Sequence, residues 1–161
     1  MTIQVGDKLP EATFRIMTAD GPAARTVAEI FAGKTVVLFA VPGAFTPTCH
    51  KNHMPGFVAN AETLKGKGVD AIYATSTNDV FVLDAWQKAS GAVDKVGILA
   101  DGSADFAKAI GLANDMSAFG MGMRSKRYSM VVKDGVVTSL NIEDAPGKAD
   151  VSGADNLLKQ L

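Results

Sequence analysis

Apolar and polar residues alternate along this chain in blocks that predict strands and helices in turn. Residues 35–41 (TVVLFAV) are β-branched or apolar at nearly every position, which is typical of a strand buried on both faces. Residues 48–65 are expected to form a helix that Pro55 and Gly56 kink or divide. Residues 69–76 (VDAIYATS) have the pattern of a second strand.

The same alternation continues in the second half of the chain. Asn78 and Asp79 have side chains suited to cap the apolar-spaced helix that follows them. Residues 96–100 indicate a third short strand, and residues 104–110 a short helix that ends at Gly111.

Two further strands and a last helix complete the expected order of elements. Residues 128–132 and 136–140 are β-branched runs joined by Lys-Asp-Gly, a strong hairpin signal. Residues 154–161 are expected to form an amphipathic helix. This order predicts one α/β domain over residues 1–161, with a central mixed sheet and helices on both faces.

Composition and charge exclude several classes of function. The chain has 161 residues, a length typical of one domain that buries enough surface to fold without a disulfide or a metal. Its 16 Lys and Arg against 17 Asp and Glu, a net charge of -1, give no electrostatic attraction for nucleic acid or an anionic membrane.

The expected compartment is the cytoplasm. The first residues show no basic flank followed by an apolar region, so we expect no signal peptide. No apolar stretch approaches the roughly 20 residues that a membrane span needs. One cysteine cannot form an internal disulfide, which agrees with a reducing environment.

That single cysteine, Cys49, lies in the sequence VPGAFTPTCH, between a strand and the start of a helix. A free cysteine is usually a small buried hydrophobe. Here a helix N-terminus, with its unpaired N–H groups and partial positive charge, favours a thiolate over a thiol. Because ligands of α/β sheets bind beyond the carboxyl ends of central strands, and a hydroxyl stands three residues earlier, we expect a reactive sulfur.

The motif around this cysteine resembles the active-site pattern P-x-x-x-T-x-x-C of the peroxiredoxins, with Pro42, Thr46 and Cys49 at its three fixed positions. The longer string VPGAFTPTCHKNHMPGF is similar to the type-II, or peroxiredoxin-5-like, subgroup. The similarity continues through GDKLP near the start, residues 78–86 and residues 124–132, and so covers essentially the whole chain.

The resemblance implies a thioredoxin-like fold and the reduction of hydrogen peroxide and organic hydroperoxides by a thiol. Cys49 would be the nucleophile, with the Thr46 hydroxyl bridging thiolate and peroxide. Pro42 and Gly43 would line the pocket and shield the sulfur, while the backbone N–H groups of Thr48 and Cys49 would bind a peroxide oxygen. No cofactor or metal is implied.

The resemblance also assigns a fixed cation to Arg127, which would favour the thiolate and bind peroxide oxygens. By charge pattern alone, Arg127 belongs to a basic run that starts at Arg124 and is more simply a solvated surface residue. Arg124 also matches a family position, for which we expect a supporting role.

The two histidines admit other chemistry. His53 follows Cys49 by four residues, so both lie on one face of a continuous helix, as a cysteine-protease pair or two zinc ligands would. Zinc lacks further ligands, since His50 and His53 are the only histidines, and a protease pair lacks an orienting group. The resemblance makes His53 a wall of the pocket, and we expect His50 to be merely exposed.

The methionine-rich residues 116–123 (MSAFGMGM) are typical of core or interface packing. In related proteins the loop at this point forms an apolar collar around the peroxide pocket and part of a dimer surface. The resemblance therefore places Phe119 in the collar and implies a homodimer.

The segment near the C-terminus, GKADVSGADN, lacks the second cysteine that some relatives carry there. An oxidised Cys49 would then need an external thiol, for which we expect glutathione with glutaredoxin first and thioredoxin second. A non-catalytic redox sensor or chaperone on the same fold is an alternative. A general thiol–disulfide oxidoreductase is disfavoured because the C-x-x-C motif is absent.

Overall fold

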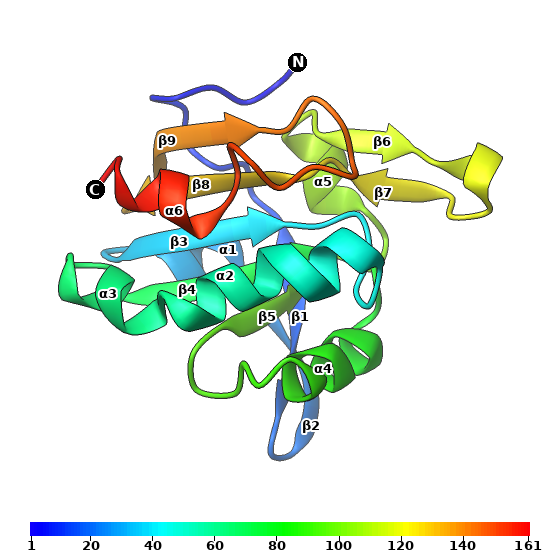
Figure 1. Ribbon diagram of the computed structural model, residues 1–161, viewed down its shortest axis with the longest axis horizontal. Coiled ribbons are helices and arrows are strands. Elements are labelled where there is room, and N and C mark those ends of the chain that lie inside the picture. The colour runs from blue at the N-terminus through cyan, green and yellow to red at the C-terminus, as the bar shows by residue number, and fades with distance from the viewer.

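The computed structural model describes residues 1–161, and a seven-stranded sheet runs through its centre (Figure 1). The strands of this sheet are β1 (Thr13–Thr18), β2 (Gly21–Thr26), β3 (Thr35–Ala40), β4 (Ala71–Ser76), β5 (Gly97–Ala100), β8 (Tyr128–Lys133) and β9 (Val136–Ile142). Their spatial order is β2-β1-β5-β4-β3-β8-β9. The pairs β3–β4 and β4–β5 are parallel and the other neighbours antiparallel, so the sheet is mixed as expected.

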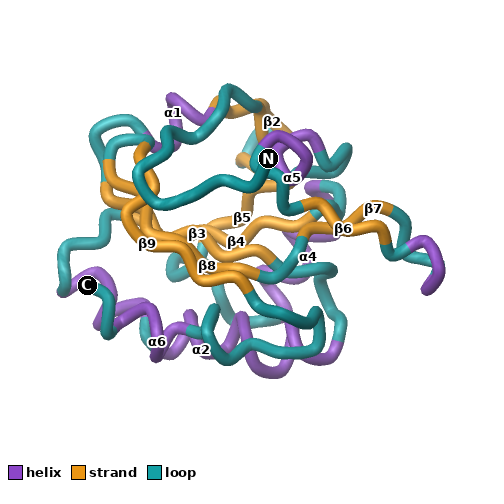
Figure 2. The backbone as a smooth tube through the Cα atoms, turned by 90° about the horizontal axis from the view of Figure 1, so that it is seen from above, coloured by secondary structure: helices purple, strands orange, loops and turns teal.

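Helices cover both faces of this sheet. They are α1 (Val27–Phe31), α2 (Met54–Ala59), α3 (Ala61–Gly66), α4 (Val80–Ala89), α5 (Asp105–Ala109) and α6 (Ala154–Leu158). In the view from above, α1 and α5 lie on one side of the sheet, and α2 and α6 on the other (Figure 2). None of these helices is both long enough and apolar enough to cross a membrane.

Strand β3 is apolar throughout because both of its faces are buried. Val37 and Phe39 pack into the hydrophobic core that includes residues of α2, α3 and α4. Val36 and Leu38 point the other way, into the core shared with α1 and α5. Period-two alternation sends successive side chains to opposite faces, so a strand between two helical layers needs apolar residues at every position.

Most of the remaining predicted elements are confirmed within a few residues. Asp79 is the N-cap of α4, where its carboxylate accepts a hydrogen bond from the Val82 N–H. The predicted hairpin is β8–β9, and Asp134 and Gly135 at its turn both have positive φ, as a type I′ hairpin turn requires. The last helix, α6, ends at Leu158 and is shorter than expected.

The helix expected over residues 48–65 is divided differently from the prediction. It starts with a π-helical turn, η1 (Cys49–His53), and continues directly into α2. Pro55 and Gly56 do not divide it, because Pro55 lies in the first turn of α2, where its missing N–H is not needed. The interruption comes at Asn60, between α2 and α3.

Two hairpins have no counterpart among the predicted elements. β1 and β2 pair at one edge of the sheet, and the sequence of β2, GPAART, carries little strand propensity. β6 (Ala113–Asp115) and β7 (Met123–Ser125) form a separate two-stranded sheet, with the 3₁₀ turn η2 (Ser117–Phe119) at its tip. This second hairpin projects from the body of the molecule (Figure 1).

Replacing Gly135 with alanine tests the hairpin turn. Gly135 has a φ of +77°, and an added Cβ would meet no atom within 4 Å, so the cost is backbone strain alone. We expect Gly135→Ala to lower the free energy of unfolding by about 1–2 kcal/mol in urea titrations. Gly66→Ala, in open space at the end of α3, is the control and should raise stability by about 0.4–1 kcal/mol. Equal changes in the free energy of unfolding for the two variants would contradict the positive φ assigned to Gly135.

Candidate active site

The pairing of β3 with β8 brings Cys49 and Arg127 together. Ala40, the last residue of β3, lies opposite Tyr128, the first residue of β8. The chain that leaves β3 therefore passes beside Arg127, which directly precedes Tyr128. Phe45, with a φ of +64°, lies in the loop that leads to Cys49 at the start of η1.

Two donors converge on the buried sulfur of Cys49. The side chain of Cys49 is fully inaccessible to solvent. The Thr46 hydroxyl lies 2.8 Å from Sγ, and Nη2 of Arg127 lies 2.9 Å from it. Neither the Thr48 nor the Cys49 backbone N–H has an acceptor within the chain. The arrangement surrounds the sulfur with groups that attract negative charge.

Arg127 is a buried cation with a partner for each of its nitrogens. It is 2% exposed, and no carboxylate lies within 4.0 Å of its guanidinium. Nε donates to the Pro146 carbonyl at 3.1 Å, Nη1 to Nδ1 of His53 at 2.9 Å, and Nη2 to the Cys49 sulfur. A buried guanidinium that has no carboxylate partner favours another anion in contact with it. Among its three partners, only the Cys49 sulfur can carry a negative charge.

The contacts of His53 determine its protonation. Arginine can only donate, so Nδ1 of His53 must accept; the hydrogen therefore sits on Nε2, which donates to the Ser152 carbonyl at 2.9 Å. Burial lowers the pKa of His53 to about 3, and the neighbouring Arg127 charge acts in the same direction, against the hydrogen bond to Ser152. The ring packs beside Phe39 and Phe57. His53 is thus a neutral bridge between Arg127 and Ser152.

Arg124, by contrast, does not reach the sulfur. Its Nη1 donates to the Pro42 carbonyl at 3.3 Å and its Nε to the Met121 carbonyl at 2.8 Å. Gly43 lies in this corner, where a Cβ would stand 3.2 Å from the Thr46 methyl and 3.4 Å from the Arg124 guanidinium. Arg124 therefore braces the loop before Cys49, and Gly43 leaves room for it.

His50 differs from expectation. It is half-buried, and its Nδ1 accepts a hydrogen bond from Nε1 of Trp86 at 3.2 Å. Trp86 is fully buried on α4, so its indole N–H needs an acceptor. His50 therefore ties the cysteine turn to α4. The two residues are 36 positions apart, and no sequence pattern linked them.

Phe119 lies on the β6–β7 hairpin, apart from the hydrogen bonds that join Cys49, Arg127 and His53. It is 78% exposed and lies at the tip of the β6–β7 hairpin. Met121 of the same hairpin comes nearer, with its methyl 3.6 Å from a Cβ built on Gly43. Phe119 is therefore largely open to solvent within one chain, and its role in the collar stays a prediction.

The segment between β9 and α6, residues 143–153, supplies contacts that the sequence did not indicate. Its carbonyls accept from Arg127 and His53, as above, and the Gly147 carbonyl accepts from the Thr48 hydroxyl at 3.1 Å. No sequence signal marks these residues, because the atoms that reach the site belong to the backbone. No group of three His, Cys, Asp or Glu side chains is placed to hold a metal.

Comparison with known proteins places the chain among enzymes that act on peroxides. The Redoxin family model matches residues 4–158. Peroxiredoxin-2E-2, chloroplastic, from Oryza sativa subsp. japonica is 48% identical over 165 residues, an alignment that covers 99% of this chain and 73% of that protein.

Solved structures similar to this chain include peroxiredoxins. Reduced Prx3 from Vibrio vulnificus in complex with hydrogen peroxide is 50% identical, with a TM-score of 0.94 and 99% of each chain covered. Peroxiredoxin 5 from Alvinella pompejana is 29% identical, with a TM-score of 0.86 and coverage of 98% of this chain and 96% of its own. These similarities confirm the thioredoxin-like fold expected from the sequence.

The neutral state of His53 predicts a pH dependence of stability. The unfolded chain takes up a proton at His53 below about pH 6.5, whereas in the folded chain the pKa of His53 is about 3. Stability should therefore fall as pH drops through this window, by up to about 1.4 kcal/mol per pH unit from this residue. His53→Gln can keep both hydrogen bonds without titrating. Urea unfolding between about pH 6.5 and 5 should show a shallower slope for this variant; equal slopes would contradict the assignment.

Proposed function

This chain belongs to the redoxin family and is a peroxiredoxin of the peroxiredoxin-5-like type, a thiol-dependent peroxidase, and from that premise we propose that Cys49 attacks the peroxide. The observation that carries the proposal is the pair of donors on its sulfur, the Thr46 hydroxyl and Nη2 of Arg127. Both stabilise a thiolate more than a thiol, and the thiolate is the nucleophilic form.

In the proposed reaction, the Cys49 thiolate attacks the terminal oxygen of a hydroperoxide. An S–O bond forms, the O–O bond breaks, and the leaving oxygen departs with the electron pair as an alkoxide or hydroxide that takes a proton from water. The sulfur is oxidised to sulfenic acid while the peroxide is reduced. Arg127 and the free N–H groups of Thr48 and Cys49 offer donors to the oxygen on which charge develops.

Thr46 is proposed to orient the peroxide. Its hydroxyl has one hydrogen and two acceptors within reach, the Gly43 carbonyl at 2.7 Å and the Cys49 sulfur at 2.8 Å. When the hydrogen turns toward Gly43, a lone pair on the hydroxyl oxygen can accept the hydrogen of an incoming hydroperoxide. The Arg124 bond to Pro42 and the small size of Gly43 support the pocket that places it.

Regeneration is proposed to depend on an external thiol. The chain has one cysteine, so the sulfenic acid has no partner within it. Glutathione would form a mixed disulfide with Cys49 and release water, and a glutaredoxin thiol would then take the glutathione by exchange. Because Cys49 is buried, a small thiol reaches it with less rearrangement than a protein does, so we place thioredoxin second.

We also propose that residues 1–161 act as one domain and pair as a homodimer in the cytoplasm. Strands from both halves of the chain pair in a single seven-stranded sheet, which supports one domain. Large exposed apolar side chains on the cysteine loop, on α4 and on the β6–β7 hairpin support a partner surface: Phe45, Phe81, Phe119 and Met123. The name of the rice relative refers to the chloroplast, and a single free thiol is compatible with either reducing compartment.

Conservative substitution of the two arginines should separate their roles. Arg127→Lys keeps the charge but loses the planar fork that contacts Cys49 and His53 together, so peroxide attack should slow by roughly 10- to 100-fold. Arg124→Lys should slow it much less, because Arg124 contacts only backbone carbonyls. Stopped-flow oxidation by hydrogen peroxide gives both rate constants. Similar losses would show that Arg127 is not the residue that activates the sulfur.

Mass spectrometry should identify the oxidation products. Peroxide alone should leave sulfenic acid on Cys49 and, in excess, sulfinic or sulfonic acid. One equivalent of peroxide with glutathione should give a glutathione adduct on Cys49, since no other thiol in the chain competes for the sulfenic sulfur. Cys49→Ser should give no adduct. A predominant disulfide between two Cys49 side chains would contradict regeneration by an external thiol.

A further inference from the structure

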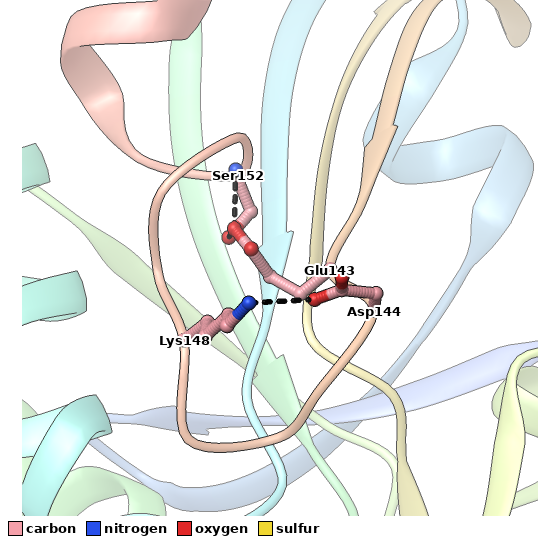
Figure 3. Close-up of polar contacts among 4 residues, drawn as sticks. All are labelled: Glu143, Asp144, Lys148 and Ser152. Atoms are coloured by element: carbon pink, nitrogen blue, oxygen red, sulfur yellow. Dashed lines mark hydrogen bonds and ion pairs between the residues drawn. The ribbon is translucent and has the colours of Figure 1, made fainter.

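The loop between β9 and α6 is closed at its base by a buried polar pair. The Glu143 carboxylate accepts hydrogen bonds from both the backbone N–H and the hydroxyl of Ser152, each at 2.6 Å (Figure 3). Glu143 is 7% exposed and Ser152 fully buried. No cationic side chain lies within 4.0 Å of the carboxylate. A buried carboxylate without a cation is costly unless donors satisfy it, and both donors here come from Ser152.

This loop holds the guanidinium of Arg127 from two sides. The Pro146 carbonyl accepts from Nε, and the Ser152 carbonyl acts through His53, whose Nδ1 accepts from Nη1. Two of the three nitrogens of Arg127 are therefore oriented by the loop, and the third contacts the Cys49 sulfur. The backbone of Glu143 adds a direct link, because its N–H donates to the Arg127 carbonyl at 3.0 Å.

The other bonds along the loop are more peripheral. Figure 3 shows Lys148 reaching Asp144 across the loop, but this ion pair is 3.5 Å long and its side chains are 54% and 81% exposed. Exposed pairs of this kind contribute little. The contact between Thr48 and Gly147 is a single hydrogen bond at the rim. Nδ2 of Asn156 also donates to the Val151 carbonyl at 2.7 Å, but this bond is exposed. Apart from its contact with His53, Ser152 itself is held by the two buried bonds that Glu143 accepts.

We propose that Glu143 is a positioning residue for peroxide reduction, and that its carboxylate oxygen fixes Ser152 so that His53 and Pro146 hold Arg127 against the Cys49 sulfur. The inference rests on the proposed role of Arg127. When the Glu143 bonds are lost, the Ser152 carbonyl moves and His53 loses its acceptor. The guanidinium then has one fixed contact fewer, and small displacements of a catalytic group reduce rates strongly.

Variants at Glu143 and its neighbour test the proposal. Glu143→Ala removes the acceptor, whereas Glu143→Gln retains an oxygen that can accept both Ser152 bonds. Asp144→Asn is the matched control, since it breaks only the exposed ion pair of the same loop. The measurements are the rate constant for oxidation by hydrogen peroxide in a single turnover, the thiolate fraction at neutral pH from ultraviolet absorbance, and the urea midpoint.

We expect Glu143→Ala to slow oxidation by about 10- to 100-fold and to lower the thiolate fraction, with Glu143→Gln restoring most of both and Asp144→Asn behaving as wild type. A folded Ala variant with an unchanged rate and thiolate fraction would overturn the proposal, whether or not its stability falls. Equal losses in the Gln and Ala variants, or in the Asn control, would overturn it too.

Two further measurements cover a variant that does not fold and separate the positioning role from the proposed function. If Glu143→Ala does not fold, Ser152→Ala removes one of the two donors and should slow oxidation in the same direction by a smaller factor. Wild-type protein and Arg127→Lys are measured alongside. A wild type that does not react would refute the proposed function itself, and one that reacts no faster than Arg127→Lys would refute the role proposed for Arg127. A fast wild type with an insensitive Glu143 would refute only the positioning role.

Discussion

The buried guanidinium of Arg127 is the constraint around which the site is organised. It carries a permanent charge at a position that is 2% exposed, and no carboxylate contacts it. A charge in such surroundings needs a hydrogen-bond acceptor at each nitrogen, and the fold supplies a carbonyl, an imidazole and a sulfur. The sulfur is the one of the three that can become an anion, so the buried charge of Arg127 is the physical basis for the reactivity proposed for Cys49.

The sheet makes this contact possible, and the surrounding apolar side chains strengthen it. Cys49 and Arg127 are 78 residues apart in sequence. The antiparallel register of β3 and β8 brings them together, so that Nη2 of Arg127 lies 2.9 Å from the Cys49 sulfur. Phe39 and Phe57 pack around the ring of His53 and exclude water from that side. In a medium of low polarity each hydrogen bond to a charged group is worth more, and each unmatched one costs more.

The fold was predictable where burial imposes a strong pattern and much less so elsewhere. The apolar run of β3, the Asp-Gly turn of β8–β9 and the Asp79 cap follow from local physics, and all three occur as expected. The β1–β2 hairpin was not predicted, and its second strand, β2, lies at the edge of the sheet, where a strand needs no apolar alternation. The division of the helix after Cys49 was misplaced, because Pro55 is equally compatible with a break and with the first turn of a helix. The π-turn Cys49–His53 has no counterpart in the prediction.

By itself the sequence determined the class of fold and singled out Cys49 as the proposed reactive residue, since strand periodicity, a cysteine at a helix start and a long family motif are all local features of the chain. It also named Arg127, but only through the resemblance, because nothing local distinguishes it from Arg124. Tertiary structure decided which arginine meets the sulfur, which tautomer His53 adopts and which loop holds them. Those contacts join residues far apart in sequence, partly through backbone carbonyls, which every residue possesses and no sequence pattern can mark.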